Sequence, residues 1–110
     1  MSSDLKKNSL VDSFLSNLRL EKGLSENTIK AYSNDCYAFN KWLFLNKRYE
    51  AASAIEADIE NYLKHLNSIN LSNSTINRKL SSLKHFFNFL SKTKLLKSNP
   101  VITLELLPSP

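Results

Sequence analysis

The chain has 110 residues, enough for one small domain, and its 42% apolar and 23% charged residues are typical of a soluble globular protein. Its single glycine excludes glycine-rich nucleotide-binding loops, and its single cysteine with two histidines excludes an internal disulfide and a structural zinc site. The net charge of +5 indicates an acidic partner.

The first half of the sequence predicts two amphipathic helices. Apolar residues three or four positions apart predict a helix over about residues 9–21. Gly23 is expected to end this helix in the left-handed conformation, and Ser25 to cap a second helix that runs to about Asn46. The apolar face of the second helix contains Ile29, Tyr32, Cys36, Phe39 and Leu43.

The second half predicts two further helices. A shorter one covers about residues 55–68, and acidic residues near its start suit the helix dipole. A longer one begins near Ser74, and Asn99-Pro100 is expected to stop it. Its apolar face contains Ile76, Leu80, Leu83, Phe87 and Leu90.

The positive charge is concentrated in the last predicted helix. Residues 72–98 contain six lysines and arginines and no acidic residue, whereas residues 50–71 are net acidic. On a helical wheel the polar face of this helix contains Ser74, Arg78, Ser81, His85, Asn88 and Lys92, with Lys84 on its flank. The second helix has a polar face of Asn27, Lys30, Asn34, Ala38 and Lys41. Both faces are candidates for contact with phosphate.

The sequence shows no catalytic or metal-binding arrangement. Asp58 and Glu60 point about 200° apart on a helix, so we expect two solvated carboxylates and no catalytic pair. Cys36 falls on an apolar face, where a thiol is usually buried and inert. Phe86 and Phe87 are expected in the core, which argues against base stacking on them. The pattern does not decide whether His85 contacts phosphate or water, or what Trp42 covers.

Three segments in order resemble one known family. They are LSENTIKAYSNDCYAFNKWL, IEADIENYLKHL and STINRKLSSLKHFFNFLSKTKLLKSNP. Together they resemble the N-terminal core-binding domain of phage-integrase and Xer-type tyrosine recombinases, over about residues 9–100. The resemblance implies an all-α, SAM-like fold, an orthogonal bundle of four main helices. It also implies that the domain forms half of a clamp around duplex DNA, with the second and fourth helices towards the major groove.

The resemblance implies a division of the chain and of its function. Residues 1–98 are expected to form the DNA-binding domain, and residues 99–110 to begin a linker to an absent C-terminal catalytic domain. The fragment itself is therefore expected to be no enzyme, and its four tyrosines no nucleophiles. The implied partners are duplex DNA and other recombinase protomers in a synaptic complex, and the isolated domain is expected to be a monomer.

The candidate DNA contacts lie on the two polar faces, and no catalytic or metal-binding residue is proposed. They are Lys30, Asn34 and Lys41 on the second helix, and Ser74, Thr75, Arg78, Ser81, Lys84 and His85 on the fourth. One alternative is a helical protein-interaction module whose basic face docks an acidic partner. Another is a helix-turn-helix regulator, for which no short recognition helix after a tight turn is found.

The location expected from the sequence is the cytoplasm. No apolar run approaches the roughly 18 residues of a membrane span, and the N-terminal residues lack the apolar core of a secretory signal. A free cysteine also suits a reducing compartment. No cofactor is expected.

Overall fold

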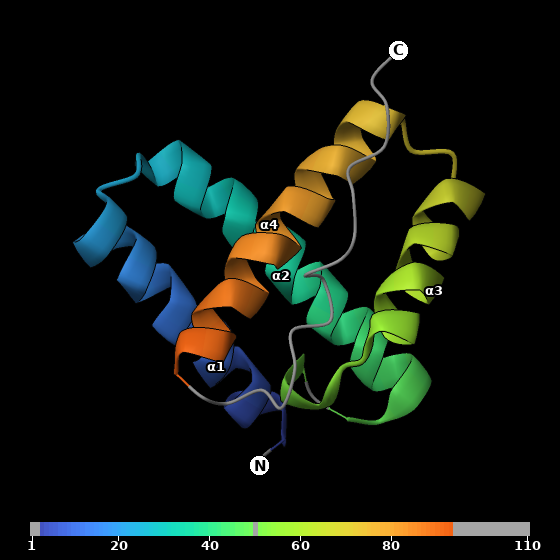
Figure 1. Ribbon diagram of the computed structural model, residues 1–110, viewed down its shortest axis with the longest axis horizontal. Helices are drawn as coiled ribbons and strands as arrows, with labels where there is room; N and C mark the ends of the chain where they lie inside the picture. The colour runs from blue at the N-terminus through green and yellow to red at the C-terminus, as the bar shows by residue number, and fades with distance from the viewer. Residues whose placement is uncertain (1–2, 50, 94–110) are drawn as a thin grey trace. The chain divides into compact units, whose positions relative to one another are not determined.

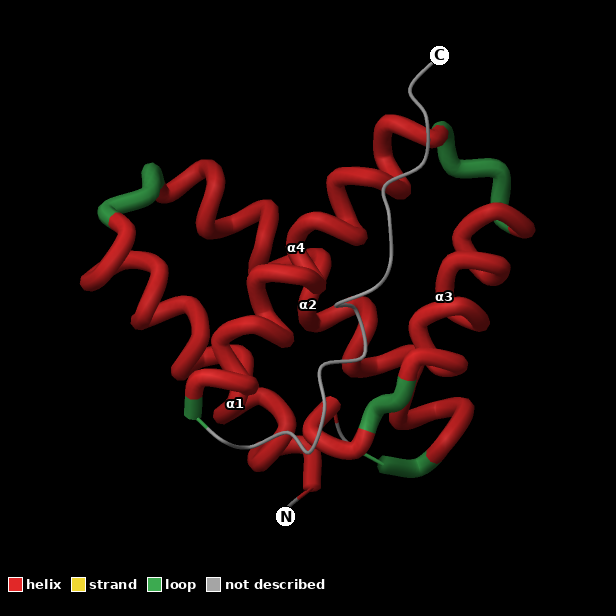
Figure 2. The backbone as a smooth tube through the Cα atoms, in the orientation of Figure 1, coloured by secondary structure: helices red, strands yellow, loops and turns green. Residues whose placement is uncertain are grey.

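The computed structural model describes residues 3–49 and 51–93, which consist of helices and short connections (Figure 1). The α-helices are α1 (Ser3–Asn17), α2 (Glu26–Lys47), α3 (Glu56–Ser68) and α4 (Asn73–Lys92). A π-helical turn (Leu18–Lys22) continues α1, and a 3₁₀ turn (Ala51–Ser53) precedes α3. These residues contain no strand (Figure 2), so the prediction of an all-α fold with four main helices is confirmed.

The chain divides into two compact units, Met1–Ala51 and Ala52–Pro110. Each unit contains two helices joined by a short turn, α1 with α2 and α3 with α4 (Figure 1). The two helices of each unit contact one another, so each unit is a helical hairpin.

The first hairpin begins earlier than the sequence predicts. The helix predicted over residues 9–21 starts at Ser3 and changes to π-helix at Leu18. Its buried residues are Val11, Phe14, Leu15 and Leu18, which lie on one side of the helix as the apolar spacing predicts. Gly23 ends the helix with a φ of 62°, as predicted, because glycine adopts the left-handed conformation without a steric penalty.

The second helix has the predicted start and nearly the predicted end. The Ser25 Oγ accepts a hydrogen bond from the Thr28 N–H at 3.3 Å, so Ser25 is the N-cap. At the other end Arg48 is left-handed, and its N–H donates to the Phe44 carbonyl at 2.9 Å. The buried residues of α2 are Ile29, Asp35, Cys36, Phe39, Asn40 and Leu43.

Burial makes the single cysteine chemically inert, as predicted. Cys36 is fully buried, and desolvation, with a smaller contribution from the charge of Asp35, raises the pKa of its thiol far above the usual value. On the same helix Trp42 is half-buried, and its ring lies 6.2 Å from that of Phe39. The indole therefore packs at the edge of the core.

The first turn of α3 corrects the prediction for Asp58. This residue is buried, and its Oδ2 accepts a hydrogen bond from the Ile55 N–H at 3.0 Å. The carboxylate therefore caps the helix and is not solvated, whereas Glu60 is exposed. Ile59, Tyr62 and Leu66 form the buried face of α3.

The apolar face of α4 agrees with the prediction, but its length does not. Phe86 and Phe87 are fully buried, with ring centroids 5.4 Å apart, so neither ring is available to stack on a base. The helix ends at Lys92, short of the predicted stop at Pro100. At this end the Thr93 hydroxyl donates to the Leu90 carbonyl at 2.9 Å and its N–H to the Phe89 carbonyl at 3.2 Å. The predicted linker, residues 99–110, lies outside the described residues.

Asn40 is expected to cost stability. It is 5% exposed, and neither its Nδ2 nor its Oδ1 has a hydrogen-bond partner among the described residues. Leucine has the same branched shape without the polar atoms, so Asn40→Leu should raise the free energy of unfolding by about 1 kcal/mol. Urea denaturation followed by circular dichroism measures this change. Asn34→Leu, on the exposed side of α2, is the control and should change the free energy of unfolding little. A loss of stability in Asn40→Leu would mean that the buried amide of Asn40 does not destabilise the fold.

Tyr37 is expected to ionise late. Partial burial and its hydrogen bond to the Asp12 carboxylate, which joins α2 to α1, raise the pKa of Tyr37 to about 12. The stabilisation by the neutral phenol is therefore complete below the unfolded pKa of about 10 and lost as the pH rises through 12. Phenolate absorbance should contain a late component from Tyr37, which disappears in Tyr37→Phe and moves to lower pH in Asp12→Asn. Tyr32→Phe should leave it unchanged.

Candidate nucleic-acid interface

Helix α4 begins with a serine cap that the sequence analysis missed. The Ser72 Oγ accepts from the Thr75 N–H at 3.1 Å, and its hydroxyl donates to the Thr75 Oγ1 at 3.1 Å. Thr75, a predicted DNA contact, is half-buried and belongs to this cap. The spacing of serine and threonine is the signal that could have located the cap, because Ser25 and Thr28 have the same spacing.

One face of α4 is polar and contains no acidic residue. Because successive residues turn by about 100°, its polar residues fall on one side of the helix, with Lys84 about 80° from Ser74. Ser74, Arg78, His85, Asn88 and Lys92 are exposed, and Ser81 and Lys84 are half-buried. These seven residues are called the α4 polar face below. The predicted contacts of the fourth helix other than Thr75 therefore lie together on this face.

Two neighbouring cations of α4 differ in their surroundings. Arg78 is exposed on the α4 polar face, whereas Lys79 is half-buried next to the apolar side. A lysine in that position runs its aliphatic chain along apolar surface and keeps only its ammonium group in water. Arg78 is therefore better placed than Lys79 to reach a ligand on the polar face.

The predicted contacts on α2 are also exposed on one side of their helix. Lys30, Asn34 and Lys41 are exposed, together with Asn27 and Ala38, and these five residues are called the α2 polar face. The acidic residues of α2 are Glu26 and Asp35. Asp35 is 1% exposed, so its carboxylate does not reach the exposed surface.

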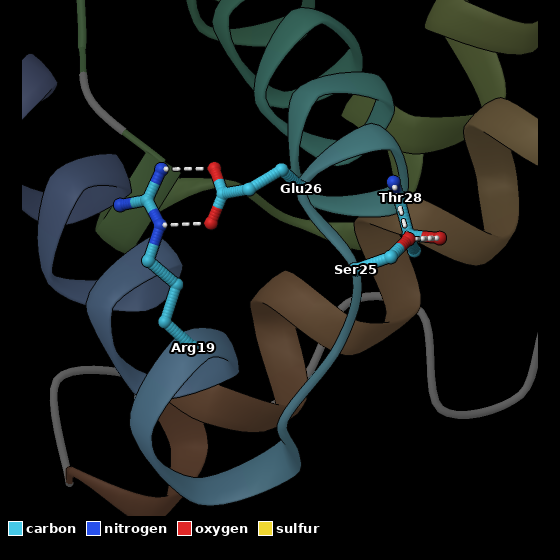
Figure 3. Close-up of polar contacts among 4 residues, drawn as sticks. All are labelled: Arg19, Ser25, Glu26 and Thr28. Carbon is cyan, nitrogen blue, oxygen red and sulfur yellow. Dashed lines mark hydrogen bonds and ion pairs between the residues drawn. The ribbon is translucent and has the colours of Figure 1, made fainter.

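The charge of Glu26 is compensated by an ion pair (Figure 3). The Arg19 Nε and Nη2 donate to the two carboxylate oxygens of Glu26 at 3.1 and 3.3 Å. Their side chains are 50% and 75% exposed, so the pair contributes little to stability. It does offset the one exposed negative charge of α2, which would otherwise repel a polyanion near the start of the helix.

The two polar faces offer the groups that bind phosphates and base edges. Lysine and arginine neutralise phosphates, and serine hydroxyls and asparagine amides donate hydrogen bonds to phosphates and bases. In residues 3–49 and 51–93 no three histidine, cysteine or carboxylate side chains are grouped as metal ligands. Within the same residues no helix is long and apolar enough to cross a membrane.

Comparison with known proteins identifies relatives of the chain. It is 33% identical over 96 residues to the tyrosine recombinase XerD of Shewanella oneidensis, a match that covers 87% of this chain and 32% of the relative. It is 37% identical over 98 residues to XerC of Lactobacillus delbrueckii subsp. bulgaricus, covering 88% and 33%, and 35% identical over 83 residues to XerC of Staphylococcus aureus, covering 74% and 27%. The chain thus spans about a third of the length of these relatives.

No solved structure matches the chain significantly. The family model described as phage integrase, N-terminal SAM-like domain matches residues 11–94, which include all four helices of the described chain except the first turns of α1. The match and the recombinase relatives agree with the resemblance seen in the sequence. The chain therefore belongs to the family of phage-integrase N-terminal, SAM-like domains.

Proposed function

We propose that this chain is the core-binding domain of a site-specific tyrosine recombinase and holds duplex DNA at the recombination site. The observation that carries the proposal is the α4 polar face, on which Arg78, Lys84, His85 and Lys92 lie without a single acidic residue. Such a face suits a polyanion, because each lysine or arginine that meets a phosphate releases a counterion. The α2 polar face supplies further contacts through Lys30 and Lys41.

The proposal assigns DNA binding to residues 1–98 and strand exchange to a separate catalytic domain. Residues 99–110 then begin the linker to that domain. The relatives of this chain are named tyrosine recombinases and are about three times as long as the chain. This length supports a division into a DNA-binding domain and a separate catalytic domain. The four tyrosines lie in or next to helices of the two hairpins. Tyr37 donates a hydrogen bond to Asp12, and the ring of Tyr62 is buried beside His65.

The partners in this proposal are duplex DNA and, during synapsis, other protomers of the recombinase. Duplex DNA as the partner implies a cytoplasmic location. A protein-interaction module with an acidic partner is the competing function, and the salt dependence of DNA binding separates the two.

The isolated chain should bind duplex DNA weakly and with only a small sequence preference. For four to six phosphate contacts by half a clamp, we expect a dissociation constant of about 10⁻⁴ to 10⁻⁶ M near physiological salt. The slope of log affinity against log salt should be about −4 to −5, from roughly 0.9 per phosphate. Fluorescence anisotropy at several salt concentrations measures both quantities. A slope near zero would favour the protein-interaction module.

Arg78→Ala and Lys79→Ala should differ in their effect on DNA binding. Arg78→Ala should weaken binding by roughly 1–3 kcal/mol if the guanidinium contacts a base, or flatten the salt slope by about one if it holds a phosphate. Lys79→Ala should weaken DNA binding much less, because Lys79 lies next to the apolar side of α4. Titration of both variants against one duplex at two salt concentrations compares them, with circular dichroism to check that helicity is retained. Equal losses, or a larger loss for Lys79→Ala, would mean that another face of α4 meets the DNA.

A further inference from the structure

The second helix of each hairpin begins with the same sequence pattern. Leu-Ser-x-x-Thr-Ile occupies residues 24–29 and, 47 positions later, residues 71–76. A left-handed residue precedes both copies, Gly23 with a φ of 62° and Asn70 with a φ of 65°. In both copies the serine hydroxyl donates to the threonine Oγ1 at 3.1 Å and the isoleucine N–H donates to the serine carbonyl at 3.0 Å. Helices α2 and α4 therefore start with the same local geometry.

The buried positions of α2 and α4 correspond at the same offset. The pairs are Ile29 and Ile76, Asp35 and Ser82, Cys36 and Leu83, Phe39 and Phe86, Asn40 and Phe87, and Leu43 and Leu90. Leu80 is the additional buried residue of α4. Because the cap fixes the start of each helix and the same positions are buried, each exposed residue of one helix has a defined counterpart in the other.

The first helices of the hairpins correspond as well, with one residue of difference. The buried residues Val11, Phe14 and Leu18 of the first hairpin lie 48 positions before Ile59, Tyr62 and Leu66 of the second. The offset changes from 48 to 47 between Leu18 and Gly23, which is where the π-helical turn lies. A π turn accommodates one extra residue in a helix, so the buried positions of the two hairpins correspond on both sides of the turn.

The exposed sides of the two copies carry different chemistry. The α4 residues Ser74, Arg78, Ser81, His85, Asn88 and Lys92 have the α2 counterparts Asn27, Ala31, Asn34, Ala38, Lys41 and Leu45. At three positions seven residues apart, α4 has arginine, histidine and lysine where α2 has two alanines and a leucine. Ala38 and Leu45 are exposed, and Ala31 is half-buried. The side of α2 that corresponds to the cationic stripe of α4 is thus small and apolar, with an amide between the alanines.

We infer that α2 discriminates between base pairs, with Asn34 as the discriminating residue, and that α4 holds the phosphate backbone; this inference rests on the proposed function. Lys30 and Lys41 are exposed on either side of Asn34 and bring α2 to the DNA through its phosphates. The alanines let the helix backbone approach the bases closely, and their methyl groups suit the thymine methyl. The stripe of Arg78, His85 and Lys92 meets phosphate oxygens, which carry no direct sequence information.

The chemistry of Asn34 specifies the base pair it prefers. A carboxamide offers one acceptor and one donor side by side, which matches the N6 amino group and N7 of adenine in the major groove. A guanine presents two acceptors there, and an amide cannot satisfy both with its donor and acceptor. Helix α2 therefore favours A·T pairs.

A modified base tests this assignment with the full 110-residue chain. Two A·T-rich duplexes of one sequence are compared by fluorescence anisotropy, one with adenine and one with 7-deazaadenine, which lacks the N7 acceptor but keeps Watson–Crick pairing. The unmodified chain should bind the adenine duplex about fivefold more tightly than the 7-deazaadenine duplex. This factor is the lower end of the discrimination expected from one bidentate base contact. Asn34→Ala should bind both duplexes equally, and Asn34→Leu, which keeps the branched shape of the amide, should behave in the same way.

The counterpart position in α4 provides the matched control. For Ser81→Ala, and likewise for Arg78→Ala, the affinity for the adenine duplex and the affinity for the 7-deazaadenine duplex should fall by the same factor. The fivefold ratio between the two duplexes should therefore remain. If the wild-type chain binds both duplexes equally, or if Asn34→Ala keeps the ratio, the inference is wrong while the proposed function stands. If neither duplex is bound in a salt-dependent way, the proposed function itself fails. Circular dichroism confirms that each variant is helical.

Discussion

The start of each long helix is the constraint on which the rest of the structure depends. A left-handed residue followed by a serine cap sets the first residue of α2 and of α4. From that start each residue turns the helix by about 100°, so apolar residues three or four positions apart fall on one side. Phe39 and Phe86 lie on that side and are buried, whereas Asn34 and Arg78 lie on the other side and are exposed. Core and candidate interface are thus two sides of the same helices.

The distribution of charge follows from how the acidic residues are used. The Asp12 carboxylate accepts a hydrogen bond from Tyr37, Glu26 pairs with Arg19, and Asp58 caps α3. These carboxylates serve the hairpins internally, while the lysines and arginines of α2 and α4 remain at or near the surface. A chain of modest net charge thereby presents a helix face that carries Arg78, Lys84 and Lys92 and no acidic residue. Long-range attraction of a polyanion depends on such local concentration more than on the total charge.

Apolar periodicity was sufficient to predict the four helices and most of their buried residues. Ser25 and Gly23 were predictable as helix boundaries, because a serine cap and a left-handed glycine both act on the adjacent backbone. The π-helical turn was not predictable, because its presence depends on one extra residue between Leu18 and Gly23. The end of α4 was missed because the Thr93 hydroxyl bonds back to the helix well before any proline.

The polar residues of the core were the harder part of the prediction. Asp58 lies one turn before the buried Tyr62, at the edge of the apolar face, and its carboxylate accepts a hydrogen bond from the Ile55 N–H. Asn40 directly follows the buried Phe39, and neither polar atom of its side chain has a partner among the described residues. The polar faces of α2 and α4 were predictable as exposed surfaces, since exposure follows from the same periodicity as burial. Periodicity alone does not indicate what these faces bind; DNA is inferred from the chemistry of their side chains.

The burial of Cys36 makes the chain convenient for site-specific labelling. It is the single cysteine of the sequence, and its thiol is fully buried with a raised pKa, so the reactive thiolate is scarce at neutral pH. A cysteine introduced at an exposed position such as Ala38 or Leu45 would then react with a maleimide dye or spin label while Cys36 stays unmodified. Fluorophores can thus be attached to α2 without first removing the native cysteine, which would leave a cavity in the core.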